Sequence, residues 1–258
     1  MRLQLMSWPE VADYLDRCQG IVVPVGSTEQ HGPNGLVGTD ALVAEAIAWR
    51  AAREGDDLLV GPTLAYAPAQ FNLDFAGTVS VRASTLTRIV EDVIASLART
   101  GFRHLYFVNG HGANIAAVRS AFHDAHQSMV LARRGPPLRL RLRSWWELPE
   151  TDALRRRLYG AREGMHATPS EVAVTRALHP DIDPAVEMAA HVALDAAYLR
   201  DHAGDAHDDA ITHRRAFPDG RVGSDPALAN REDGEALLAT AARELHADYR
   251  RFLEESPA

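Results

Sequence analysis

The stretch PVGSTEQHGPNGLVGTD, residues 24–40, organises the interpretation of the whole chain. It follows a short β-branched run at 21–25 and precedes a segment with helical periodicity. Glu29 and His31 are two residues apart, so their side chains leave an extended backbone on the same side. Asp40 follows at the start of the expected helix. Because Glu, His and Asp are metal ligands, the stretch predicts a metal site that needs at least one further ligand from elsewhere.

Composition limits the classes of function. Of 258 residues, 46% are apolar and 24% are charged, which is typical of a soluble globular protein. The net charge of −8 argues against a general nucleic-acid binder. The chain lacks both an apolar run of about 18 residues, which a transmembrane helix needs, and a signal-peptide pattern. The single Cys18 cannot form an internal disulfide. We therefore expect a cytoplasmic protein without a membrane or nucleic-acid partner.

Strand and helix patterns alternate along the chain. Short apolar or β-branched runs predict strands at 21–25, 58–60, 104–108 and 138–143. Helical periodicity predicts helices at about 7–17, 39–53, 84–100, 114–126, 149–159, 171–179 and 230–252. Thr39 and Ser84 are the expected N-caps of two of these helices, and Gly101 is an expected C-terminal stop. No linker divides the pattern, which predicts one doubly wound α/β domain over residues 1–258.

Three glycine-containing junctions, each expected between a strand and a helix, carry the candidate ligands. The first is 24–40, the second is NGHGAN with His111, and the third is GMHATPSE with His166 and Glu171. The ends of parallel strands share one edge of a sheet, where ligands bind. Carboxylates and imidazoles gathered there would repel one another unless cations neutralised them. Two divalent ions sharing a carboxylate explain the set, and one ion beside acid–base groups is the alternative.

Each candidate ligand also has an explanation without a metal. Asp40 suits the positive end of a helix dipole. Glu171 fits a capping box with Thr168, and Pro169 stands at the first helical position. Glu29 and the loop histidines could be solvated or bonded to backbone. The coincidence of all these residues at three junctions favours the metal site.

Two further segments have weaker signals. Residues 63–84 are rich in proline and aromatic residues without periodicity, which predicts a functional loop that shapes a pocket. His202, His207 and His213 lie in a polar stretch without ligand spacing, and we expect them on the surface.

Four motifs in this order resemble the creatininase (creatinine amidohydrolase) family. They are residues 24–40, 109–114, 166–171 and GSDPALANREDGEALL at 223–238. The resemblance covers roughly residues 20 to 240, which is most of the chain. It implies a three-layer α/β/α sandwich around a mostly parallel sheet, a dinuclear centre of Zn, Mn or Fe, and a homo-oligomer, commonly a hexamer. It also implies hydrolysis of a C–N amide bond.

The resemblance assigns roles to particular residues. Its metal ligands are Glu29 and His111 for one ion, His31 and Glu171 for the other, with Asp40 bridging. His166 takes the position of a proton-transfer histidine, and Trp145 or Trp146 that of a substrate-binding tryptophan. Creatininase has a further glutamate ligand where this chain has Ala113, and a mobile tryptophan where it has Arg162. These departures argue against creatinine as the substrate.

The expected chemistry is hydrolysis of a small linear or cyclic amide. Two ions about 3.5–4 Å apart would hold a hydroxide that attacks the carbonyl, and His166 would deliver a proton to the leaving nitrogen. One alternative is a peptidase that trims a short modified peptide in cofactor maturation, as mycofactocin-associated members do. The other is a non-catalytic, metal-stabilised binding protein, which the complete set of ligands disfavours.

Overall fold

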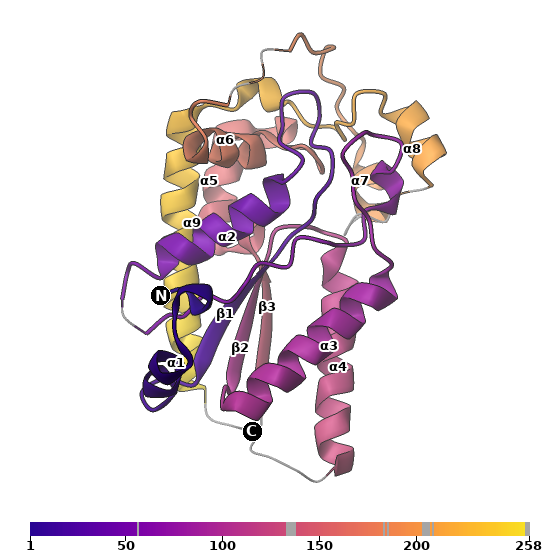
Figure 1. The fold of residues 1–258 in the computed structure, drawn as a ribbon. Coiled ribbons are helices and arrows are strands. Elements are labelled where there is room, and N and C mark those ends of the chain that lie inside the picture. Colours follow the sequence, from indigo (N-terminus) through magenta and orange to yellow (C-terminus); the bar gives the residue numbers. More distant parts are fainter. Residues whose placement is uncertain are drawn as a thin grey trace.

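A parallel sheet of three strands lies at the centre of the molecule (Figure 1). The computed structural model describes residues 1–255 except 56, 133–137, 183, 185, 203–206 and 208. The strands, in the order β1-β2-β3, are β1 (Gly20–Val25), β2 (His104–Asn109) and β3 (Arg139–Ser144). Val25 pairs with Asn109, and Asn109 with Ser144. The three carboxyl ends are therefore level, and the loops that leave them rise into the upper half of Figure 1.

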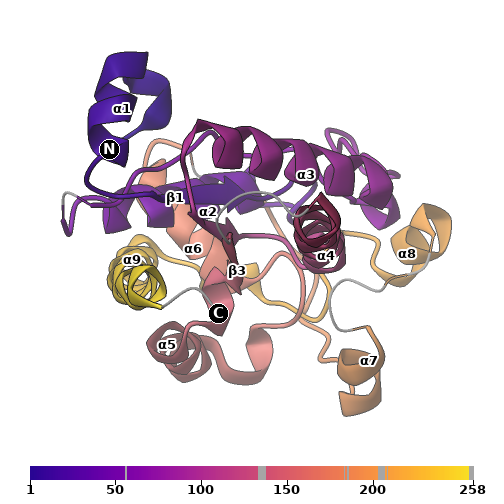
Figure 2. The same ribbon diagram turned by 90° about the horizontal axis from the view of Figure 1, so that it is seen from below.

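Helices cover both faces of this sheet (Figure 2). The longer helices are α2 (Thr39–Ala51), α3 (Ala83–Thr100), α4 (Asn114–Ala132), α5 (Pro149–Tyr159), α6 (Pro169–Leu178) and α9 (Arg231–Glu254). The shorter ones are α1 (Trp8–Leu15), α7 (Ala196–Asp201) and α8 (Ala210–Ala216). Among the described residues, no helix is both long and apolar enough to cross a bilayer.

Alternate strand residues enter two separate cores. Val22 and Tyr106 pack with residues of α2 and α9, whereas Val23 and Phe107 pack with residues of α3 and α4. Successive side chains of a strand point to opposite faces, so the central residues of β1 and β2, which are buried on both faces, are apolar at successive positions. Strand β3 instead alternates arginine with leucine. The predicted three-layer α/β/α sandwich is confirmed.

Helix α9 lies unusually close to α6, and one glycine makes this possible. A Cβ atom at Gly234 would stand 1.9 Å from the backbone oxygen of Ala173, which no side chain tolerates. The glycine belongs to the last of the four sequence motifs. Its contact fixes α6, the helix whose first turn carries Glu171.

Some predicted boundaries were wrong for local reasons. The run 58–60 is not a full strand, since Val60 forms only isolated parallel bridges with Arg2 and Val22. Thr39 does not cap α2; Gly38 holds that position and the Thr39 hydroxyl donates to the oxygen of Leu36. Ser84 lies inside α3, whose N-cap is Arg82. Gly101 ends α3 with a φ of 120°, as predicted.

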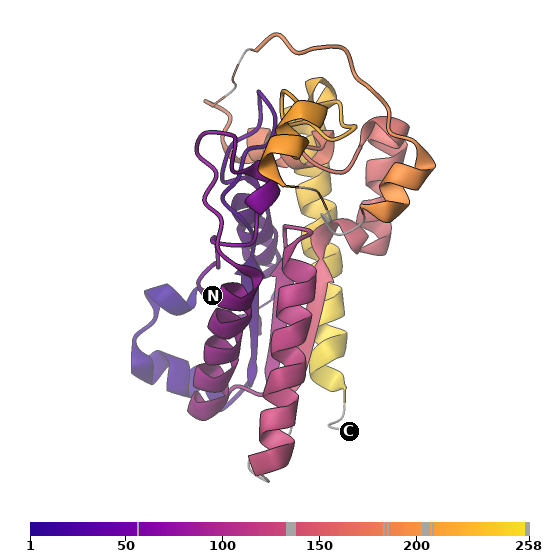
Figure 3. The same cartoon turned by 90° about the vertical axis from the view of Figure 1, so that its right-hand side faces the viewer.

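The histidines near α8 are not all on the surface. His213 is 2% exposed, and its ring lies 5.1 Å from that of Phe71, centroid to centroid. His207 is half-buried, with its ring 4.8 Å from Phe71. Phe71 belongs to a single 3₁₀ turn, Gln70–Asn72, within the 63–84 segment. In Figure 3, α7 and α8 lie above the carboxyl ends of the strands, where this segment also passes.

Candidate metal centre

Six titratable side chains converge beyond the carboxyl ends of β1 and β2. They are the six predicted from the sequence: Glu29 and His31 after β1, Asp40 in the first turn of α2, His111 after β2, and His166 and Glu171 at the start of α6. Each is at most 9% exposed. The structure thus brings together all the predicted ligands and the predicted proton-transfer histidine.

The three histidines are oriented in the same way. One ring nitrogen of each lies at a backbone carbonyl: His31 Nδ1 is 3.1 Å from Glu29 O, His111 Nε2 is 2.7 Å from Pro68 O, and His166 Nε2 is 2.7 Å from Gln30 O. A carbonyl oxygen only accepts, so these nitrogens donate. Metal-binding histidines commonly donate their second ring N–H in this manner.

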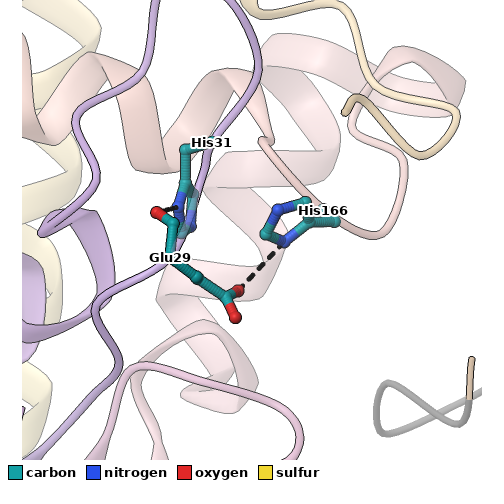
Figure 4. Close-up of side chains that lie close together, drawn as sticks. All are labelled: Glu29, His31 and His166. Carbon is teal, nitrogen blue, oxygen red and sulfur yellow. Dashed lines mark hydrogen bonds and ion pairs between the residues drawn. The ribbon is translucent and has the colours of Figure 1, made fainter. Parts of the chain in front are cut away.

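The remaining ring nitrogens face carboxylates. His31 Nε2 lies 2.9 Å from Asp40 Oδ1, and His111 Nδ1 lies 3.3 Å from Asp40 Oδ2. The Nδ1 atoms of His111 and His166 both lie 3.4 Å from Glu29 Oε1. Figure 4 shows the Glu29 carboxylate pointing toward the His166 ring. Each imidazole therefore turns its other ring nitrogen toward a shared set of acidic oxygens.

The ligand atoms form three overlapping groups, each with its atoms within 4.8 Å of one another. The groups are Glu29–Asp40–His111, His31–Asp40–Glu171 and Glu29–His31–His166. Asp40 belongs to the first two. Such sharing is the arrangement expected of a carboxylate that bridges two ions.

The charges of this cluster fit divalent cations. Three carboxylates are buried together, and Asp40 Oδ2 accepts no hydrogen bond from the described residues. Burial by itself lowers the pKa of His31, but the carboxylates of Asp40, Glu171 and Glu29 raise it to about 10. Burial raises the pKa of Glu171 to about 7. Without cations the cluster therefore retains protons, and bound cations would displace them.

Zinc binding is expected to release between about one and two protons per chain at pH 7. His31, with its pKa near 10, and part of the Glu171 population are protonated in the metal-free chain. Because the metal-free state holds more protons, zinc affinity falls as the pH falls. Calorimetry at one pH in two buffers of different ionisation enthalpy measures the release. Affinity that is constant from about pH 6 to 8 would contradict this expectation.

Glu171 both caps α6 and belongs to a candidate ligand group. Oε2 accepts from the backbone nitrogen and the hydroxyl of Thr168, which completes the predicted capping box. Glu171 also belongs to the ligand group with His31 and Asp40, to which it offers one carboxylate oxygen. The capping explanation and the ligand explanation are therefore compatible.

Two asparagines hold the turn after β2. Asn109 Nδ2 donates to the oxygen of His111, and Asn114 Nδ2 donates to the oxygen of Gly26. Between them, a Cβ atom at Gly110 would stand 2.2 Å from the backbone oxygen of Asp40. Gly110 therefore lets the first turn of α2 approach His111.

The third junction was predicted to follow a strand, and this was wrong. His166 and Glu171 come after α5 and a short 3₁₀ turn, Gly160–Arg162. The His166 backbone forms only an isolated antiparallel bridge with Val222. Val222, which directly precedes the late motif, thus pairs with the third junction and holds it near the sheet edge. The sequence had predicted a strand in that role.

A cavity of about 320 Å³ opens beside the cluster. Its described lining includes Asp40, His111, Trp145, Trp146, Arg155, His166 and Glu171. Trp145 is buried, and its Nε1 has no hydrogen-bond partner in the described part of the chain. Sequence reasoning missed Arg155, because it stands within a run of three arginines that resembles an exposed helix face.

The 63–84 segment does not shape this cavity, contrary to expectation. None of the described lining residues comes from it. It contacts the histidines from outside: the oxygen of Pro68 accepts from His111, and Asn72 Nδ2 lies 3.4 Å from His166 Nε2. The segment therefore supports the site, and the two predicted tryptophans form the cavity wall.

Comparisons with known proteins agree with this geometry. The family model for creatininase, creatinine amidohydrolase, matches residues 4–248. The chain is 39% identical over 110 residues to the mycofactocin precursor peptide peptidase of Mycobacterium tuberculosis (strain CDC 1551 / Oshkosh), across 39% of this chain and 43% of that protein. It is 31% identical over 173 residues to creatinine amidohydrolase of Pseudomonas putida, across 63% and 65%. These matches span less than two thirds of either relative. A solved creatininase variant complexed with creatine matches with a TM-score of 0.80 at 25% identity, covering 97% of each chain.

Proposed function

This chain belongs to the creatininase family, and we propose that it is a metal-dependent hydrolase of a C–N amide bond in a small substrate. One observation carries the proposal: two groups of buried ligand atoms share the Asp40 carboxylate beside a cavity. A capping acid or a solvated loop histidine needs no such sharing. The same complete set disfavours a binding protein that has lost its catalysis.

We propose that two divalent ions, of Zn, Mn or Fe, occupy these groups. Glu29 and His111 would hold one ion, His31 and Glu171 the other, and Asp40 both. Mixed oxygen and imidazole ligation suits all three metals. When bound, such ions polarise a carbonyl and lower the pKa of a water molecule to near neutrality.

The residues of the chain would bind and orient the amide. Trp145 and Trp146 offer flat apolar walls in the cavity, and the unpartnered indole N–H of Trp145 can donate to a carbonyl or similar acceptor. His166 lines the same cavity and can move a proton to the leaving nitrogen. Ala113 and Arg162, which replace residues characteristic of creatininase, make an amide other than creatinine the expected substrate.

A peptidase that trims a short modified peptide is the second candidate. The observation that favours it is the 39% identity to the mycofactocin precursor peptide peptidase. The chemistry at the metal centre would be the same, and the substrate would extend out of the cavity. By family resemblance we also propose a homo-oligomer, commonly a hexamer, for either candidate.

Metal analysis with an amide screen tests the proposal. We expect about two ions per chain, loss of hydrolysis in chelator, and its return with Zn, Mn or Fe. The screen contains creatinine, small linear and cyclic amides, and short peptides. Cleavage of the peptides alone would select the second candidate. A chain that takes up no metal in any preparation would refute both.

A further inference from the structure

We propose that Gln30 and Asn72 are positioning residues for His166. The backbone oxygen of Gln30 keeps a hydrogen on Nε2, Asn72 holds Gln30 in place, and Nδ1 is therefore the atom that exchanges the proton. The catalytic part of this inference rests on the proposed hydrolysis. The hydrogen position itself does not, and it can be measured in the protein without turnover. Neither Gln30 nor Asn72 is among the described residues that line the cavity, so both would act through His166.

The position of the hydrogen follows from two contacts of Nε2. The nitrogen lies 2.7 Å from the backbone oxygen of Gln30 and 3.4 Å from Asn72 Nδ2. At 2.7 Å from an oxygen that can only accept, the ring nitrogen has to donate. If Nε2 instead accepted from Asn72, two lone pairs would face each other across the shorter contact. The short contact therefore decides the tautomer.

The orientation of the Asn72 amide is fixed by the Gln30 side chain. Gln30 Nε2 donates to the oxygen of Gly220 at 2.9 Å, and Gln30 Oε1 accepts from the nitrogen of Gly32 at 2.7 Å. The same Gln30 Nε2 donates to Asn72 Oδ1 at 2.8 Å. The Asn72 NH₂ group is consequently the end that faces His166. Asn72 thus anchors the residue whose carbonyl accepts from His166. Its own NH₂ group and Nε2–H are both donors, so the 3.4 Å contact between them is not a hydrogen bond.

Packing restricts the ring of His166 on its other sides. Its centroid lies 4.6 Å from that of His31, and Phe71 meets it edge-on at 6.2 Å. The residue is 4% exposed. With Nε2 held by Gln30, the opposite nitrogen, Nδ1, points to Glu29 Oε1 at 3.4 Å (Figure 4). Nδ1 therefore faces the ligand cluster and carries the lone pair.

Neutron diffraction from crystals of the zinc-loaded chain grown in D₂O tests the tautomer. We expect deuterium on Nε2 of His166, directed at the oxygen of Gln30. Absence of deuterium from Nε2 would overturn the proposal. The result does not depend on hydrolysis, so the test remains decisive even if no substrate is found. Conversely, finding the expected tautomer would not support the proposed hydrolysis if the chain had no activity.

Two variants test the positioning role. Asn72→Ala is expected to lower kcat by about 10- to 100-fold on the amide that the screen identifies, with KM within about twofold and two zinc ions retained. Asn72→Asp keeps an acceptor for Gln30 and places another near Nε2–H, so it is expected to retain the deuterium on Nε2 and to recover kcat. An unchanged kcat in Asn72→Ala, or a decrease that only follows lost zinc, would refute the role.

Tyr106→Phe is a matched control for the loss of one buried hydrogen bond. The Tyr106 hydroxyl donates to Asp248 Oδ2 at 2.8 Å, in the core between the sheet and α9. We expect this variant to lose a similar amount of thermal stability with kcat within about twofold of the original chain. A kcat decrease equal to that of Asn72→Ala would mean that general destabilisation explains both.

Discussion

Asp40→Ala is expected to abolish hydrolysis and to remove both ions while the fold persists. Asp40 is the one residue common to the two ligand groups that hold the proposed pair of ions. Its loss removes an oxygen from each group and leaves Glu29 and Glu171 without the bridge between their ions. The side chain is not part of the two apolar cores, so the sandwich does not depend on it. Metal content per chain, circular dichroism and activity on the identified amide measure the result.

Asp248→Ala is the matched control for Asp40→Ala. Asp248 is also a largely buried aspartate, at 8% exposure, but it pairs with Arg141, Arg143 and Arg251 on α9 and β3. We expect this variant to be less stable, because the half-buried Arg141 and the buried Tyr106 hydroxyl lose their partner. It should keep two ions and its activity. Full activity or two retained ions in Asp40→Ala would refute the bridging role.

Local sequence patterns correctly predicted those features of the fold and of the site that depend on residues close together in the chain. The β-branched run before Gly26 formed a fully buried strand, and the capping box of Thr168 and Glu171 formed as its spacing predicts. Gly110, next to His111, lets the first turn of α2 approach this junction.

Contacts between distant segments account for what the sequence did not predict. His213 is buried because α8 packs on the 3₁₀ turn that contains Phe71, far from it in the chain. The third junction is held at the candidate metal centre by pairing with Val222. The element before it is a helix, where the sequence had predicted a strand. Asn72 contacts His166 across a similar distance in sequence. Spacing within one segment contains no information about such pairs.

His166→Gln is expected to lower kcat by about 10²–10⁴-fold with both ions retained. His166 lies outside the two ligand groups that share Asp40, although it belongs to a third group with Glu29 and His31. A glutamine amide can still donate to the backbone oxygen of Gln30, but it cannot exchange a proton near neutral pH. The loss should be smaller for substrates whose leaving nitrogen is less basic, because these need less help from an acid.

His111→Gln makes the same chemical change at a histidine that is proposed to bind a metal ion. His111 Nδ1 lies within 3.4 Å of both Glu29 and Asp40, so its loss should remove one ion together with the activity. Metal content therefore separates the two variants: about two ions in His166→Gln and about one in His111→Gln. If His166→Gln also lost an ion, Nδ1 of His166 would be a metal ligand, and the third group would describe a real coordination site. Its proton-transfer role would then have to pass to another group that lines the cavity.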